Sequence, residues 1–377
     1  MAQYRTPTVG EPAPTFRARM SGGSSIKLDL AAGRYFVLCF FGSATDEQGQ
    51  SALRSVQQHR DMFDDEKISF FGVTVDPSDE PAGHIRGELP GMRFLLDYDG
   101  EVSRLYGALP AEASAADQQV PYACKWVVVD PRMRTVAVIP FEPSGSDRAK
   151  VFDVLAALDA VDQLGGISLP VPIIAIADVF EREFCDLLIN QYETHGGQES
   201  GFIVEKDGKT IREYNYGHKR RADHIITDKR LIGEIRGRVQ RRINPEIEKV
   251  FQFKVTRIER HLVGCYEAAT GGHFGQHRDN DTKGTAHRRF AVSINLNDDF
   301  AGGEISFPEY GRRSFKMPPG TAVVFSCSLL HAVSPVTRGR RFAYLPFLYD
   351  EAAAKIREAN NPHLSAEIKT YQRQATV

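Results

Sequence analysis

The sequence predicts two domains of different class: an N-terminal α/β domain, then an α+β domain in which helices precede a β-rich barrel or jelly roll. The chain has 377 residues, more than the roughly 100–200 of one domain. Strand and helix patterns alternate in the first half, whereas short strands follow two helices in the second. A Gly- and Pro-containing break at residues 165–170 separates the patterns. We therefore expect domains at residues 1–160 and 168–377.

Continuous apolar runs in the first half have the length and composition of buried strands. They cover residues 35–41, 68–75 and 125–129. Helical patterns lie between them, at residues 51–63 and 150–164. Strands that alternate with helices favour an α/β sheet covered on both faces.

The second half begins with two helical patterns. Residues 178–181 (DVFE) resemble a capping box and open a helix with Phe180, Phe184, Leu187 and Leu188 on one face. A second stripe predicts a helix over residues 231–243. The remaining pattern predicts strands at residues 255–266, 289–296, 304–307, 321–325 and 342–349.

Charge and cysteine content exclude several classes of function. The net charge of −2 divides into −6 for residues 1–160 and +4 for residues 161–377. The positive charge of the second half suits a site that binds dicarboxylates, but it is too small for a surface that binds nucleic acid. No run is apolar and long enough for a membrane span or a signal sequence, so we expect a cytoplasmic protein. The five cysteines lack any Cys-x-x-Cys pair and predict buried free thiols.

The distribution of histidines indicates metal chemistry. Seven of the eleven histidines lie in the interval from His218 to His331. His277 and Asp279 are two residues apart, so on a strand both side chains can reach one metal. His331, after the largely apolar run of residues 321–330, is the candidate for a third ligand from a neighbouring strand. Two histidines and one carboxylate form the facial triad of non-haem Fe(II) oxygenases and leave positions for a 2-oxo acid and O2.

A 2-oxo diacid such as 2-oxoglutarate needs a fixed cation for its second carboxylate, and arginine suits that role. Arg338, Arg340 and Arg341 follow His331 closely. Strand alternation lets only one or two of them face inward, and we expect Arg338 and Arg340 to be solvated.

Other histidines and one basic run offer weaker alternatives. His273 and His287 are rival ligands, although about 13 Å of strand would separate His273 from His277. Residues 218–221 (HKRR) could border a substrate groove, but such a run is more often a solvated face.

Several motifs of residues 168–377 resemble the prolyl 4-hydroxylase-like branch of the Fe(II)/2-oxoglutarate dioxygenases. They are Tyr266, then residues 271–280 (GGHFGQHRDN), 296–304 (LNDDFAGGE), 319–320 (PG) and 331–341 (HAVSPVTRGRR). The resemblance implies a double-stranded β-helix, iron on the three predicted ligands, and 2-oxoglutarate bound by Arg341 and Tyr266.

The resemblance also implies an activity. The family uses O2 and 2-oxoglutarate to hydroxylate a C–H bond of an amino acid, peptide or protein, with succinate and CO2 as co-products, and admits L-ascorbate as an additional cofactor. The carboxylate of Asp279 favours hydroxylation over halogenation, because halogenating relatives have a small residue there.

Residues 1–160 resemble a peroxiredoxin-type thioredoxin fold. The matching segments are residues 9–10, 13–16, 35–41, 73–77, 95–100 and 106–107. The family's peroxide-attacking cysteine is missing, because residues 42–50 (GSATDEQGQ) contain no thiol. Cys39 and Cys124 are interpreted as inert. The alternative function is a thiol-redox protein with an accessory oxygenase-like domain.

Overall fold

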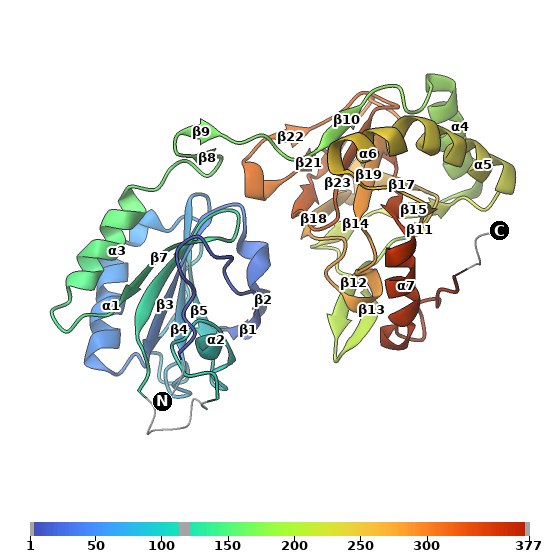
Figure 1. Cartoon of the computed structure of the whole chain (residues 1–377). Coiled ribbons are helices and arrows are strands. Elements are labelled where there is room, and N and C mark those ends of the chain that lie inside the picture. The colour runs from blue at the N-terminus through green and yellow to red at the C-terminus, as the bar shows by residue number, and fades with distance from the viewer. Residues whose placement is uncertain (1–3, 113–120, 374–377) are drawn as a thin grey trace. The chain divides into compact units, whose positions relative to one another are not determined.

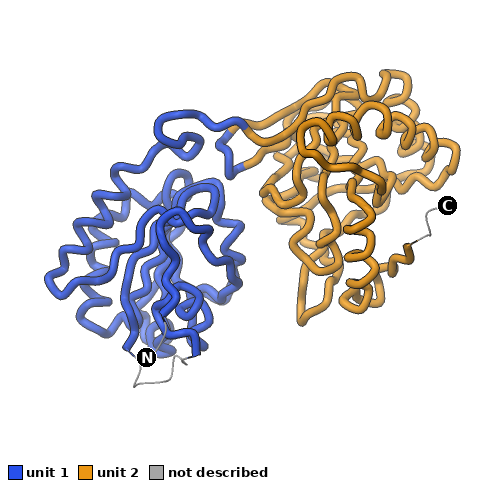
Figure 2. The backbone as a smooth tube through the Cα atoms, in the orientation of Figure 1, with its two compact units in different colours: residues 1–170, 308–312 blue, residues 171–307, 313–377 orange. Residues whose placement is uncertain are grey.

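The computed structural model describes residues 4–112 and 121–373. The chain divides into two compact units, which Figure 2 colours separately. Unit 1 contains residues 1–170 and 308–312, and unit 2 contains residues 171–307 and 313–377. Among the described residues, no helix combines the length and apolar character that crossing a bilayer requires.

Unit 1 is built on a seven-stranded mixed sheet in the order β2-β1-β5-β4-β3-β6-β7 (Figure 1). Its central strands β3, β4 and β5 are parallel, whereas β6 pairs antiparallel with β3. The strands are β1 (Arg17–Met20), β2 (Ser25–Lys27), β3 (Tyr35–Gly42), β4 (Ile68–Thr74), β5 (Met92–Leu96), β6 (Lys125–Val129) and β7 (Thr135–Pro140).

Two helices of unit 1, α1 (Glu47–Gln58) and α3 (Ser146–Ala156), cover one face of this sheet. Their apolar residues join a buried cluster that includes Val37, Cys39 and Phe41 of β3. On the opposite face, Phe40 contacts Tyr106, just beyond α2 (Glu101–Leu105). Both faces of β3 are therefore buried, which explains its uninterrupted apolar sequence.

Unit 2 contains a nine-stranded and a five-stranded sheet. The larger sheet includes β10 (Ile174–Ile176), β23 (Ala322–Ser326), β19 (Phe290–Asn295), β26 (Arg340–Tyr344), β17 (Leu262–Glu267), β15 (Ala222–Ile225), β11 (Gln198–Glu199), β16 (Arg257–Ile258) and β27 (Phe347–Tyr349). The smaller sheet is formed by β14 (Lys219–Arg220), β18 (His273–His277), β24 (His331–Val333), β21 (Ile305–Ser306) and β22 (Ser314–Phe315). Short pairs link β12 (Phe202–Lys206) with β13 (Lys209–Glu213), β20 (Ala301–Gly302) with β25 (Val336–Arg338), and β8 (Gln163–Leu164) with β9 (Ile167–Ser168) in unit 1.

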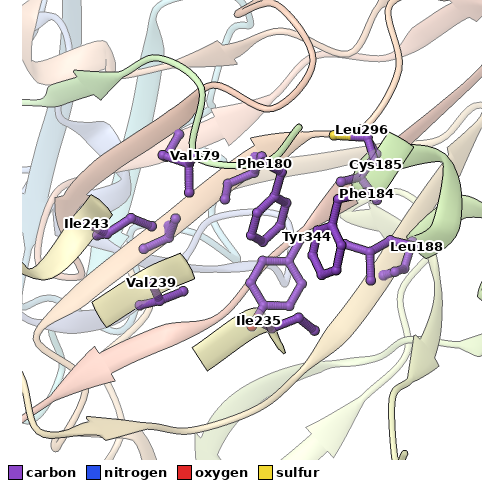
Figure 3. Packing of buried hydrophobic residues seen from close by; sticks show 14 of the residues in the cluster. Val179, Phe180, Phe184, Cys185, Leu188, Ile235, Val239, Ile243, Leu296 and Tyr344 are labelled. Carbon is purple, nitrogen blue, oxygen red and sulfur yellow. The ribbon is translucent and has the colours of Figure 1, made fainter. Parts of the chain in front are cut away.

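Helices cover one face of the nine-stranded sheet. They are α4 (Arg182–His195), α5 (Lys229–Arg238) and α6 (Asn244–Phe251), while α7 (Glu351–Ala359) follows β27. Figure 3 shows the shared core, in which Phe180 and Phe184 lie beside Tyr344 of the sheet. A separate cluster joins Tyr266 of this sheet to Phe274 of the smaller sheet. The helices thus pack on one face of β17 and β26, and polar side chains can occupy the opposite face.

The structure corrects several predicted boundaries in unit 2. No capping box opens the first helix, because Asp178 has a positive φ of 54° and the backbone of Val179 donates to Gly320. That helix begins at Arg182, and Leu187 is 40% exposed rather than on the buried face. The predicted strand over residues 255–266 divides into β16 and β17, and that over residues 342–349 divides into β26 and β27.

The second predicted helix is interrupted by a π-helical turn, η3 (Val239–Ile243), between α5 and α6. Ile235, Val239, Ile243 and Ile247 are all fully buried in the helix–sheet core. A strict four-residue repeat drifts around an α-helix of 3.6 residues per turn. The wider π turn compensates for this drift and keeps the stripe on the sheet.

In unit 1 the predicted helix over residues 150–164 ends early. The helix α3 spans Ser146–Ala156, and Gln163–Leu164 instead pairs with Ile167–Ser168 as a short hairpin. Gly165 and Gly166, with φ values of 59° and 75°, form its turn. Glycines with positive φ fit this turn but not a right-handed helix, so the predicted helix cannot extend to residue 164.

Candidate metal and co-substrate site

His277, Asp279 and His331 come together in unit 2, each with one ligand atom within 4.8 Å of the others. The Nε2 atom of His277 lies 3.6 Å from Asp279 Oδ1, and that of His331 lies 3.3 Å from Asp279 Oδ2. The three side chains are only 14%, 12% and 6% exposed, in that order. Two imidazole nitrogens and a carboxylate therefore face a common point.

Strand pairing brings the two histidines together. β18 and β24 are antiparallel neighbours, and His277 is directly opposite His331 in their register. β18 ends at His277, so Asp279 occupies the following turn, where its backbone N–H donates to Cys327 at 2.9 Å. The predicted same-face spacing on one strand therefore applies only approximately.

His331 has a different strand context from the one predicted. The apolar run before it forms β23, which belongs to the nine-stranded sheet, whereas His331 begins β24 of the five-stranded sheet. The chain changes sheet between residues 326 and 331, and this crossing places His331 beside His277 and Asp279.

The orientation of each imidazole is fixed by the main chain. His277 Nδ1 lies 2.8 Å from the carbonyl oxygen of Gly275, and His331 Nδ1 lies 3.0 Å from that of Leu329. An N–H at each Nδ1 leaves an acceptor lone pair on Nε2, the form that binds a metal. The site is therefore oriented for coordination by its backbone.

Electrostatics agree with this arrangement. Burial, together with the facing His277, lowers the pKa of His331 to about 4, so its imidazole is neutral at neutral pH. Burial alone would raise the pKa of Asp279, but the facing His331 and His277 hold it well below its usual range. A neutral imidazole and an ionised carboxylate are the protonation states that metal ligation requires.

The rival ligands lie outside this group. Both His273 ring nitrogens are near carbonyl oxygens, of Gly271 at 2.7 Å and Gly217 at 3.3 Å. His287 shares a 2.8 Å hydrogen bond with the Glu259 carboxylate. Both histidines therefore contribute to local structure.

Arg341 is almost fully buried beside Tyr266, with 2% of its surface exposed. The two residues are register partners on β26 and β17, and the guanidinium carbon lies 5.1 Å from the Tyr266 ring centre. Its Nε donates to Asn295 Oδ1 at 2.9 Å and its Nη2 to Ser293 Oγ at 3.0 Å. Among the described residues, Nη1 of Arg341 is buried with no hydrogen-bond partner.

The neighbouring arginines have different environments. Arg338 is exposed at the end of β25, and Arg340 is 42% exposed and pairs with Glu193 at 2.6 Å. Alternation along β26 places Arg341 on the inner side and Arg340 on the outer side. Arg341 is thus the buried cation of this trio.

Sequence reasoning missed a set of buried polar residues around the site. Lys219 and Arg221, expected on a solvated face, are 6% and 8% exposed. Arg221 pairs with Asp223 at 2.6 Å and donates to the Tyr266 hydroxyl at 3.3 Å. The alternation of Lys219, Arg221 and Asp223 is a strand pattern, and that signal could have identified them.

A second ion pair, which is partly buried, supports the turn that carries Asp279. Arg288 binds the carboxylate of Glu259 at 2.7 and 2.9 Å and donates to the Asp279 carbonyl oxygen at 3.1 Å. Burial opposes ionisation of Glu259, but Arg288 and His287 hold its pKa well below the usual range. Such outer contacts orient metal ligands.

Neither candidate thiol in unit 1 is an ionised nucleophile. Burial raises the pKa of Cys39 well above its usual value and that of Cys124 to about 11. All five cysteines are free. Since the thiolate is the attacking species in peroxide reduction, this environment disfavours that chemistry.

Comparisons with known proteins agree with the geometry of both units. Residues 261–349 match the family model of the 2OG-Fe(II) oxygenase superfamily, and residues 9–137 match that of the AhpC/TSA family. The chain carries a 2OG-Fe(II) oxygenase domain. Its N-terminal partner is an AhpC/TSA domain with the thioredoxin fold.

The relatives of this chain include proteins described as PKHD-type hydroxylases. Those of Synechococcus sp. strains JA-2-3B'a(2-13) and JA-3-3Ab are 28% identical over 120 residues, which is 30% of this chain. The chain spans about half (51%) of the length of these relatives.

Solved structures that match part of this chain include a Trichoplax adhaerens prolyl hydroxylase in complex with a hypoxia inducible factor peptide fragment. It is 17% identical, with a TM-score of 0.39, and the match covers 49% of this chain and 85% of that one. Peroxidoxin BcpB from Mycobacterium tuberculosis is 17% identical, with a TM-score of 0.35 and coverage of 41% and 99%.

Proposed function

We propose that this protein is an Fe(II)- and 2-oxoglutarate-dependent dioxygenase that hydroxylates a C–H bond of an amino acid, peptide or protein. The observation that carries the proposal is the convergence of His277, Asp279 and His331. Two histidines and one carboxylate with open positions are the ligand set of non-haem Fe(II) oxygenases. We also infer that the two sheets of unit 2 form a double-stranded β-helix around this triad.

The residues present fit both the metal and the co-substrate. The three ligand side chains would hold Fe(II) through two Nε2 atoms and a carboxylate oxygen. Nη1 of Arg341, which has no hydrogen-bond partner in the described part of the chain, is a buried donor of the kind that a carboxylate satisfies. The site therefore offers a metal position and, beside Tyr266, an anchor for the distal carboxylate of 2-oxoglutarate.

When bound, Fe(II) supplies the chemistry that couples O2 and 2-oxoglutarate to oxidation of the substrate, with release of succinate and CO2. The protein's part is positioning. Asn295 and Ser293 hold the Arg341 guanidinium, while Arg221 holds the Tyr266 hydroxyl. Carbonyl groups of the main chain fix the two imidazoles so that little reorganisation is needed on binding. L-ascorbate remains a prediction from the resemblance.

The triad is tested by alanine substitution of His277, Asp279 and His331 in turn. Each variant should lose formation of succinate from 2-oxoglutarate, because two remaining ligands hold the metal poorly. His273→Ala is the matched control and should retain turnover. Mass spectrometry for a product heavier by one oxygen atom would identify the substrate. Turnover at the wild-type rate in any of the three variants would refute the assignment.

The alternative, a thiol-redox protein, is less well supported. Residues 42–50 contain no cysteine, and Cys39 and Cys124 are protonated at neutral pH by virtue of their burial. The retained carboxylate of Asp279 likewise favours hydroxylation over halogenation.

A further inference from the structure

The candidate metal ligands come from two segments whose strand pairing stops at the site. His277 ends β18 and His331 begins β24, and they form the last register pair of the ladder. Beyond this pair, residues 278–280 enter a turn, while residues 327–330 lead back to β23 of the other sheet. Within the described residues, therefore, no strand ladder continues past the point where Asp279 meets His331.

Hydrogen bonds connect the two turns where the ladder ends. The backbone N–H of Asp279 donates to the Cys327 carbonyl oxygen at 2.9 Å. The Arg278 guanidinium donates to the Ser328 carbonyl oxygen. The side-chain amide of Asn280 donates to Ser328 Oγ at 2.8 Å. The two side chains that flank one candidate ligand thus converge on Ser328, three residues before the ligand on β24.

Arg278, Asn280 and Ser328, here called the clasp, differ from the inner supports of the site in their exposure. Ser328 is exposed, and its contacts with the other two residues lie at the surface. The contact from Arg288 to the Asp279 carbonyl oxygen is partly buried. Water competes for the donors and acceptors of a surface hydrogen bond, so such a bond breaks and reforms readily. The clasp is therefore a support that can open while the rest of the site stays folded.

Opening the clasp would change the distance between ligands on different segments. His277 and Asp279 belong to one segment, whereas His331 belongs to the other. A metal leaves three ligands by breaking one bond after another, and a freed ligand that stays close rebinds before the next bond breaks. Separation of the two turns lowers the local concentration of the freed ligand, so the metal escapes more often.

We propose that the clasp controls how long the metal is retained at the triad. Asn280 and Ser328 are positioning residues: neither supplies a ligand, but their hydrogen bond keeps the turn of Asp279 beside the turn that leads to His331. This inference rests on the proposed function, because it takes the triad as the metal site. It adds that the rate of metal loss depends on surface side chains that do not bind the metal.

Release of Co(II) measures retention without turnover. The full chain is loaded with Co(II) under argon and mixed with an excess of EDTA, at concentrations where the rate no longer depends on EDTA. Decay of the cobalt absorption gives the release rate. Asn280→Ala and Ser328→Ala should each release Co(II) about threefold to tenfold faster than the wild type, the range expected for loss of one hydrogen bond. The absorption spectrum of the loaded protein should not change, since all the ligands remain.

A double-mutant cycle distinguishes the clasp from general destabilisation. Because the two single variants break the same hydrogen bond, the Asn280→Ala/Ser328→Ala double variant should release Co(II) no faster than either of them. Ser328→Thr keeps a hydroxyl group and should retain slow release. Asn190→Ala is the matched control, because Asn190 makes an exposed side-chain hydrogen bond on α4, with Thr194 at 3.5 Å. Its release rate should equal that of the wild type.

Wild-type release rates in both single variants would overturn the inference, as would additive effects in the double variant or fast release from Ser328→Thr. The proposed function is judged by a separate result. If the wild type bound no Co(II), or if His277→Ala bound it as tightly as the wild type, the triad itself would be refuted, and the clasp with it.

Discussion

Nη1 of Arg341, without a hydrogen-bond partner in residues 4–112 and 121–373, is the most specific feature of the proposed co-substrate site. Asn295 and Ser293 fix the guanidinium on one side, so Nη1 is directed without freedom to turn toward another acceptor. A carboxylate that reaches it gains a charge-assisted hydrogen bond in a buried environment.

Arg341→Leu should therefore raise the 2-oxoglutarate concentration needed for half-maximal succinate formation by about a hundredfold or more, since a buried unpaired carboxylate costs several kcal/mol. The concentration of Fe(II) needed should change far less, because the triad is intact. Arg340→Leu is the control. An equal loss of affinity for iron and 2-oxoglutarate would show that Arg341 has only a structural role.

Glu259 links acidity to the stability of unit 2. Its pKa is lowered in the folded state by Arg288 and His287, so it contributes stability above about pH 4, its unfolded value, and loses it as the pH falls toward the folded value. Glu259→Gln should lower stability at neutral pH and flatten its decline below pH 4. Hydrogen exchange of unit 2 peptides across this range measures the effect. An identical decline in both proteins would contradict it.

At the scale of elements, the helix–π–helix segment from α5 to α6 holds the sheet that carries Arg341. Ile243→Ala removes a fully buried side chain at the π turn and should cost about 2–4 kcal/mol of unfolding free energy. Denaturant unfolding followed by hydrogen exchange of unit 2 reports the loss. Val250→Ala, at a position 51% exposed, should be nearly neutral. Similar costs for both would indicate that the π turn does not pack on the sheet as described.

Secondary-structure elements whose residues are uniformly buried could be predicted from the sequence. Elements whose conformation depends on contacts with distant parts of the chain could not. The run at residues 125–129 is β6 with the predicted bounds, because both of its faces are buried. The π turn was not predictable, since only packing on a distant sheet selects it. The ligand residues could be proposed from their spacing, but the contacts of Lys219 with residues 200–201 and of Arg221 with Tyr266 join parts of the chain that meet only in the folded domain.

At the scale of the whole molecule, the role of the AhpC/TSA domain can be separated from catalysis. We expect it to dock the substrate or stabilise the protein, because its reactive loop lacks a thiol. Deleting residues 1–160 should leave uncoupled 2-oxoglutarate decarboxylation largely intact but weaken substrate hydroxylation if the domain docks the substrate. A stabilising role would lower solubility and both activities together.

One result would contradict a purely docking or stabilising role for the AhpC/TSA domain. Robust peroxide reduction that is lost on Cys39→Ser or Cys124→Ser would restore the thiol-redox hypothesis.

The register that places His277 opposite His331 has a thermodynamic consequence. A divalent ion held by both residues would act as a removable cross-link between β18 and β24, available only in the native ensemble. By mass action, an ion at a hundred times its dissociation constant would shift the folding equilibrium by about 2.7 kcal/mol. The metal that enables the proposed chemistry would thus also set how long the domain survives, so that iron scarcity would decrease the amount of enzyme as well as its activity.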